Sequence, residues 1–216
     1  MGDSGAGGSV LRLQPGDGGV AILFAPEEAG VLKQLVTQLI MLLQSHSGTP
    51  LDPDPLFASL EIGGSDERPT DPALARLFPN AFADEDDAAQ FRQVTEQGLI
   101  NRKLQDAQLV IGDLDDGSGE ADSGHNTDPF DELVDDVDID GGNPISVNIT
   151  PDSFLAWART ITALRLAMAA RIGLEREEDY DRLIDEDATR GTVLVYDWLA
   201  ALLEAVLAVS AAQSED

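Results

Sequence analysis

Residues 112–144 constrain the fold most, because they contain twelve Asp and Glu residues and no Lys or Arg. Gly, Ser and Asn are frequent among the other positions. Carboxylates this dense repel one another, and the little apolar surface present cannot offset the entropy lost on folding. We therefore expect residues 112–144 to be an acidic disordered insertion. Residues 10–111 and 145–212 then form a single α-dominated domain, preceded by a disordered N-terminus at residues 1–9.

Apolar residues recur at helical spacing on both sides of this segment, which predicts amphipathic helices. Hydrophobic residues make up 43% of the chain and aromatic residues only 5%, a mixture that favours helices over a β-sandwich. The expected helices are Ala25–Gln44, Asp71–Phe78, Asp84–Asp113, one that starts at Thr150–Pro151 and ends at Gly173, Glu177–Asp185, and Gly191–Gln213. In Asp84–Asp113 we expect one face to carry Phe91, Val94, Gly98, Leu104 and Ile111.

Short β-prone runs predict a small sheet beside these helices. The stretch Val10–Phe24 contains two such runs around a Pro, Gly and Asp cluster, which is a hairpin signal. The stretch Ile145–Ile149 is apolar at alternate positions and can add a third strand. We therefore expect a mainly α fold with a small antiparallel β-sheet (α+β), in which a helical bundle packs beside an N-terminal hairpin and one later strand.

The charge balance bears on the binding partner. Forty-one Asp and Glu against thirteen Lys and Arg give a net charge of −28, which repels a phosphate backbone and speeds encounter with a basic protein. Solubility alone is the alternative reason for such a charge. Direct DNA binding needs a local basic patch, and the partner- or DNA-binding candidates lie on two predicted helices: Arg92, Arg102, Lys103, Arg159, Arg165 and Arg171. The alternative for these residues is ion pairing with nearby carboxylates.

Catalytic and metal-binding motifs are weak in this sequence. The absence of Cys excludes a disulfide, a thiolate metal site and a catalytic thiol. The string Asp136–Gly141 resembles the start of an EF-hand loop, but Val147 stands where the bidentate Glu belongs. His46 and His125 fall in predicted loops without ligand-spaced partners. We therefore expect no cofactor, no metal site and no enzymatic activity, with a divalent-metal-dependent enzyme as the remaining alternative.

The last predicted helix is apolar over most of its circumference, so it is either a core helix or faces a partner. Asp197 and Glu204 interrupt its apolar run, which argues against a membrane span. The N-terminus has no positively charged region followed by an apolar run, as an export signal would. We expect a cytoplasmic protein without a membrane partner, and the breadth of the last apolar face permits a homodimer.

Several packing motifs in this chain resemble those of the actinobacterial oxidative-stress transcriptional regulator family, AosR. The motifs are Asp71–Pro79, Ala81–Phe82, Phe91–Arg92, Arg102–Lys103, Leu155–Arg159, Leu164–Ala167 and Tyr196–Leu199. The resemblance extends over most of Val10–Val209 and implies a non-enzymatic regulator of the response to oxidants.

The same resemblance implies association with an alternative sigma factor and redox sensing through a cysteine pair. Because this chain has no Cys, the thiol switch does not carry over to it. The first hypothesis is therefore a transcription-associated oxidative-stress regulator that binds a basic protein such as a sigma factor. The alternative is a regulator that contacts DNA through an Arg/Lys helix face.

Overall fold

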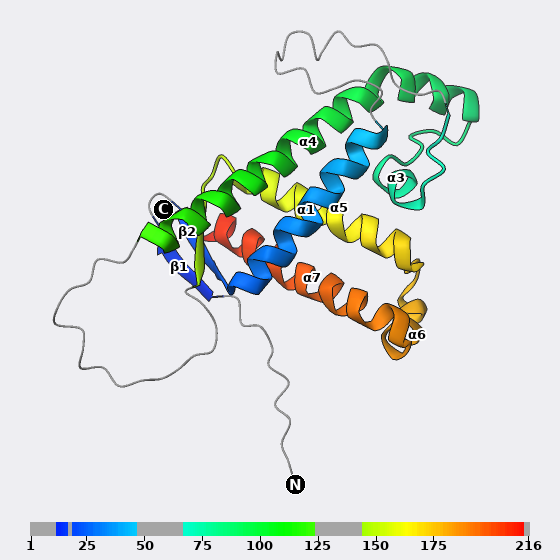
Figure 1. The fold of residues 1–216 in the computed structure, drawn as a ribbon. Helices are drawn as coiled ribbons and strands as arrows, with labels where there is room; N and C mark the ends of the chain where they lie inside the picture. The colour runs from blue at the N-terminus through cyan, green and yellow to red at the C-terminus, as the bar shows by residue number, and fades with distance from the viewer. Residues whose placement is uncertain (1–11, 17–18, 47–66, 124–143, 214–216) are drawn as a thin grey trace, which may run out of the picture.

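The computed structural model describes residues 12–16, 19–46, 67–123 and 144–213. Over these residues the protein is mostly helical with one small sheet, which confirms the expected α+β class (Figure 1). The helices are α1 (Pro26–His46), α3 (Pro72–Leu77), α4 (Glu85–Ser123), α5 (Phe154–Ile172), α6 (Glu177–Asp185) and α7 (Asp187–Gln213). The strands are β1 (Arg12–Gly16), β2 (Gly19–Phe24) and β3 (Ile145–Ile149).

The sheet has the order β1-β2-β3, and both pairings are antiparallel. The predicted hairpin and its third strand are therefore confirmed. Strand β2 is central and pairs with β3 in a register that sets Val20 opposite Ile149. Strand β1 is an edge strand and includes Pro15, which has no backbone N–H to donate.

The core forms where the apolar stripes of the helices meet the inner face of the sheet. In α1 the buried residues Leu32, Val36, Leu39 and Leu43 follow at intervals of three and four, as the amphipathic pattern predicts. Trp157 on α5 is fully buried, and its ring stacks on Phe24 of β2 at a centroid distance of 6.4 Å. This contact joins the sheet to the helices.

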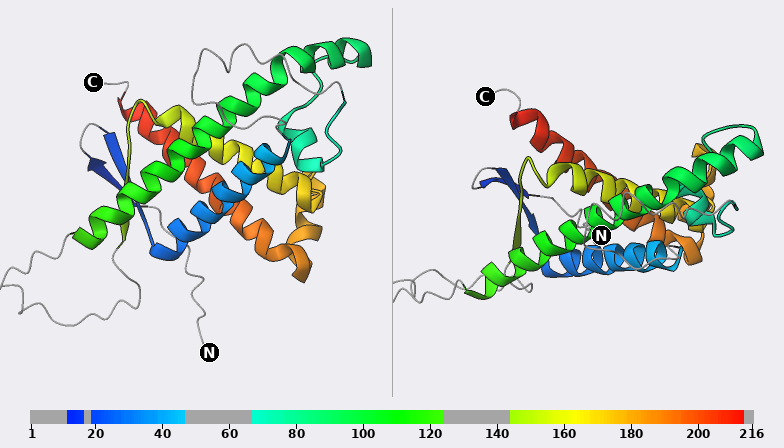
Figure 2. Two further views of the ribbon diagram at one scale, coloured as in Figure 1. Left: turned by 45° about the horizontal axis from the view of Figure 1, so that its top comes forward. Right: turned by 90° about the horizontal axis from the view of Figure 1, so that it is seen from above.

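The helices lie in two layers beside the sheet (Figure 2). Helix α4 contacts α1 and β3, and it also contacts α5, which in turn packs on α7. The sheet lies at one end of this arrangement, whereas α3 and α6 lie at the other end, against α5 and α7 respectively (Figure 1). Residues 112–123 are the C-terminal part of α4, which lies at the sheet end.

Helix α4 corrects the prediction of an acidic disordered insertion over residues 112–144. The helix continues to Ser123, so residues 112–123 are helical, while 124–143 lie outside the described residues. The reason is tertiary packing: Leu114 is buried in the core, and Gly117 lies directly against the backbone of β3. Contact with the rest of the fold here outweighs the unfavourable charge and glycine content.

The predicted face of α4 was also wrong in part. Phe91 and Val94 are exposed, at 41% and 71% of their surface, although Leu104 is buried as expected. The helix instead buries a stripe displaced around its axis. That stripe consists of Ala88, Ile100, Leu104, Ala107, Val110 and Leu114.

The starts of two later helices differ from their predicted positions. Helix α5 begins at Phe154, because Thr150 to Ser153 form a turn in which the two side chains hydrogen-bond to each other's backbone N–H groups. It ends as predicted at Gly173, whose left-handed φ of 72° suits glycine. Helix α7 begins at Asp187, earlier than the expected Gly191, so that Gly191 lies inside the helix at an exposed position.

Candidate interaction surface

Arg92 is the one predicted basic candidate that is buried, with 5% of its surface exposed. Its guanidinium donates a hydrogen bond to the Asn80 side-chain oxygen at 2.5 Å and lies 3.6 Å from a Glu85 carboxylate oxygen. It therefore ties the segment before α4 to the helix itself. A guanidinium enclosed in this way offers little surface to DNA or to a protein partner.

Arg102, Lys103 and Arg159 lie around one carboxylate, that of Asp106, where α4 meets α5. The closest contact is 3.8 Å between Arg159 Nη1 and Asp106 Oδ2. Burial raises the pKa of Asp106, while all three bases act in the opposite direction. Burial also lowers the pKa of Lys103, whose ammonium lies 5.9 Å from the centre of the Phe78 ring. Three cations against one anion make this a locally basic place on an acidic protein.

Arg165 and Arg171 lie on other parts of α5. Arg165 stacks its guanidinium over the Tyr196 ring of α7 at 4.5 Å from the ring centre. Arg171 forms an ion pair of 2.9 Å with Asp71, the residue that caps the N-terminus of α3. These two candidates therefore do not form one continuous face with Arg102, Lys103 and Arg159.

A more continuous surface feature is an apolar groove among α1, α5 and α7. It has a volume of about 520 Å³. Helices α1, α5 and α7 supply its apolar lining: Leu35, Leu39, Leu42, Leu164, Met168 and Val195. The sequence contained a signal for it, because α1 and α7 both carry apolar residues outside the stripes that reach the core.

A second, smaller hollow of about 260 Å³ continues this groove along α1 and α7. The two share Val31 and Val195, and the hollow is also lined by Leu194, which is 57% exposed. Glu27 and Glu28, in the first turn of α1, border it. We call this continuous region, with both hollows, the α1–α7 groove. It combines exposed apolar side chains with carboxylates at one end, and Arg171, which is paired with Asp71, also lines its larger hollow.

Helix α7 divides its apolar residues between the core and this groove. Val193, Leu199, Leu202 and Val206 are buried. The stretch Asp187–Ala208 is long and apolar enough to cross a bilayer by length and composition, a property that core helices of soluble proteins share. Here Asp197, in the middle of the stretch, accepts a 2.6 Å hydrogen bond from the Tyr180 hydroxyl of α6.

The histidine and metal predictions have separate outcomes. His46 does not lie in a loop: it ends α1, its ring stacks on Phe78 at 6.0 Å, and its Nε2 lies 3.2 Å from a Glu96 carboxylate oxygen. Helix α1 extends two residues beyond its predicted end at Gln44, so His46 lies in its last turn. His125 and the EF-hand-like string Asp136–Gly141 lie outside the described residues. No group of three or more His, Asp or Glu suited to a metal ion occurs in the described part of the chain.

Comparison with known proteins places these features in a family. The chain is 26% identical to "Oxidative stress regulator AosR" of Mycobacterium tuberculosis over 195 residues, which cover 86% of this chain and 79% of that protein. It is 29% identical over 190 residues to the Mycobacterium leprae protein that carries the AosR name, covering 83% and 77% of the two chains. No solved structure matches.

The family model covers nearly the whole fold. It matches residues 11–210, from the sheet to the last turn of α7. This match and the AosR relatives confirm the resemblance expected from the packing motifs. The chain therefore belongs to the family described as Domain of unknown function (DUF2017), whose AosR-named relatives are called oxidative stress regulators.

Proposed function

We propose that this protein is a cytoplasmic, non-enzymatic regulator of the response to oxidative stress that acts by binding a basic protein, such as a sigma factor, through the α1–α7 groove. The coarser role rests on the names of the AosR relatives. The α1–α7 groove carries the proposal of protein binding, because apolar hollows bordered by carboxylates suit an amphipathic segment of a basic partner.

The chemistry of the α1–α7 groove supports both parts of such recognition. Exposed Val31 and Leu194 offer apolar area that a partner's side chains can cover. Glu27 and Glu28 can meet Lys or Arg on the same partner segment, and the net charge of −28 accelerates the encounter. A redox switch inside this chain is not needed for this mode of action, which agrees with the absence of Cys.

Affinity capture with the purified full-length chain as bait, followed by mass spectrometry, tests the proposal. We expect recovery of a basic transcription component at low and moderate salt, and less recovery as the salt concentration rises. Leu194→Asp places a charge in the α1–α7 groove and should reduce capture about 5- to 30-fold, since a desolvated apolar contact is worth on the order of 1–2 kcal/mol.

Val94→Asp is the matched control for Leu194→Asp. Val94 is a similarly exposed apolar residue, but it lies on α4, away from the α1–α7 groove. Val94→Asp should therefore leave capture unchanged. Equal loss of capture in both variants would assign the effect to general acidity, and capture of no transcription component at either salt concentration would contradict the proposal.

Direct DNA contact is the second candidate function, and the basic group around Asp106 favours it. Arg102, Lys103 and Arg159 give this spot a local excess of positive charge on α4 and α5. A gel shift with genomic DNA fragments at low salt tests this candidate function. Charge reversal by Arg102→Glu together with Arg159→Glu should abolish any shift, and the absence of a shift with the unmodified protein rules this candidate out.

A further inference from the structure

A third pocket, separate from the α1–α7 groove, lies where α3, α5, α6 and α7 meet. It has a volume of about 630 Å³, within the size range of small-molecule sites. Unlike the α1–α7 groove, it is lined by many charged residues. It lies on another side of the contact between α5 and α7, because it includes Arg165 and Tyr196, which the α1–α7 groove does not.

The charges of this pocket are only partly sorted by helix, because Glu175 and Arg176, just before α6, also line it. Arg76 of α3 and Arg165 of α5 form a basic wall, whereas Glu177 and Asp181 of α6 form an acidic wall. Among the described residues, these four side chains make no ion pair with one another. Opposite charges that line one cavity without meeting leave both walls available to a ligand.

Arg165 of the basic wall stacks on an aromatic ring. Its guanidinium is held over the Tyr196 ring at 4.5 Å from the centre, an arrangement that fixes its orientation. Its Nε atom is buried and has no hydrogen-bond partner within the described part of the chain. The buried Nε is therefore unavailable to a ligand, and the rest of the guanidinium is the part that can meet an anionic group in the pocket.

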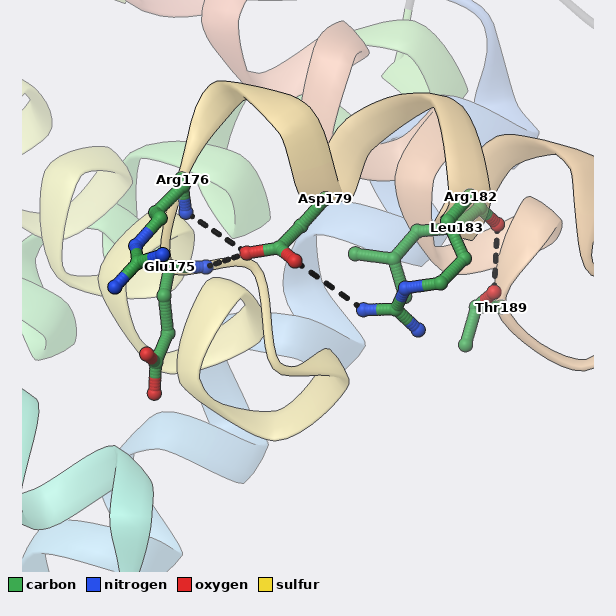
Figure 3. Close-up of polar contacts among 6 residues, drawn as sticks. All are labelled: Glu175, Arg176, Asp179, Arg182, Leu183 and Thr189. Atoms are coloured by element: carbon green, nitrogen blue, oxygen red, sulfur yellow. Dashed lines mark hydrogen bonds and ion pairs between the residues drawn. The ribbon is translucent and has the colours of Figure 1, made fainter.

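Apolar residues and the start of α6 complete the lining together with Thr162. Leu166, Ala169 and Leu174 contribute apolar surface between the charged sides. Asp179 fixes the first turn of α6, because its carboxylate accepts the backbone N–H groups of Glu175 and Arg176 at 3.1 and 2.9 Å (Figure 3). The acidic wall therefore starts from an anchored helix end.

We propose that this pocket binds a small zwitterion that carries a carboxylate, an ammonium group and an apolar portion. The carboxylate lies against Arg76 and Arg165, the ammonium group against Glu177 and Asp181, and the apolar portion on the leucine surface. A ligand with both charges satisfies both walls, whereas a simple anion leaves the acidic wall opposing it. The proposal goes beyond partner binding, since it gives the chain a small-molecule input.

Isothermal titration calorimetry on the full-length chain tests this with four probes. The zwitterions are leucine, with closely spaced charges, and 6-aminohexanoate, with widely spaced charges. Hexanoate and hexylamine each keep only one charge. We expect saturable binding of at least one zwitterion, about tenfold or more tighter than either single-charge probe, because each charged hydrogen bond contributes at least that factor. The zwitterion that binds more tightly indicates the distance between the basic wall and the acidic wall.

Variants in each wall complete the test. Arg165→Met should weaken zwitterion binding about 10- to 100-fold, while Arg102→Met, which removes an exposed arginine of α4 outside the pocket, should not change it. Asp181→Asn, at an exposed position, should weaken the zwitterion but not hexanoate. Equal affinity for hexanoate and the zwitterions, no saturable binding of any probe, or unchanged binding in Asp181→Asn would overturn the proposal.

Discussion

The contact between α4 and β3 gives the sharpest test of the fold, because it depends on one glycine. A Cβ atom added at Gly117 would lie 2.5 Å from the Ser146 carbonyl oxygen and 3.2 Å from Val147 Cγ2. The nearest obstacle is backbone in a paired strand, so it cannot rotate away as a side chain could. Either α4 or β3 must shift to admit the methyl group.

Gly117→Ala therefore combines two opposing effects. Alanine favours the helix by up to about 1 kcal/mol relative to glycine. Overpacking costs about 1–3 kcal/mol, and contact with backbone places this case in the upper half of that range. The net expectation is a loss of about 1–2 kcal/mol in the free energy of unfolding.

Gly98→Ala is the internal control, since it is the same substitution in the same helix. Nothing lies within 4 Å of a Cβ added there, so only the helix-propensity gain of about 0.5–1 kcal/mol applies. Urea unfolding followed by circular dichroism at 222 nm measures both variants. A Gly117→Ala protein at least as stable as the wild type would refute the close approach of α4 to β3.

Three further predictions concern other elements. Leu199→Ala should lower the free energy of unfolding by about 2–5 kcal/mol, because Leu199 is buried, whereas Leu194→Ala on the same helix should change it by less than about 0.5 kcal/mol. Thermal melts measure both variants, and equal melting temperatures would contradict the assignment of Leu199 to the core and Leu194 to the surface. Asp71→Ala should cost about 1–2 kcal/mol in urea unfolding, because it removes two backbone hydrogen bonds at the start of α3 and the partner of Arg171; an effect below 0.5 kcal/mol would count against the cap. Burial raises the pKa of Asp113 above its usual 3.8, so its contribution to stability is greatest below that pH and declines as the pH rises through the raised pKa. Urea midpoints of the wild type and Asp113→Asn, compared across pH, should show that the variant lacks this decline. Parallel pH profiles for the two proteins would contradict this prediction.

Local signals explain the elements that the sequence predicted well. Asp71 followed by Pro72 marks the start of α3, and the Asp71 side chain accepts hydrogen bonds from two backbone N–H groups there. The strand at Ile145–Ile149 was predicted from alternating apolar residues and has the expected bounds. In these cases the favoured local conformation and the packing of the fold agree.

Predictions failed where distant parts of the chain determine the outcome. The end of α4 could not be read from Gly112 and Gly117, since glycines and carboxylates indicate a loop until β3 is known to lie against them. The candidate binding surfaces were harder to predict from the sequence than the helix ends. No local pattern shows that Arg165 stacks on Tyr196, or that Arg76 faces the same pocket from another helix.

The edge strand β1 has a consequence for how copies of this protein can associate. An open sheet edge can recruit a strand from another molecule, which leads to strand exchange or aggregation. Pro15 interrupts the N–H groups of β1, so an added strand would lack a hydrogen bond at that position. The β1 edge is thereby less suited to strand addition.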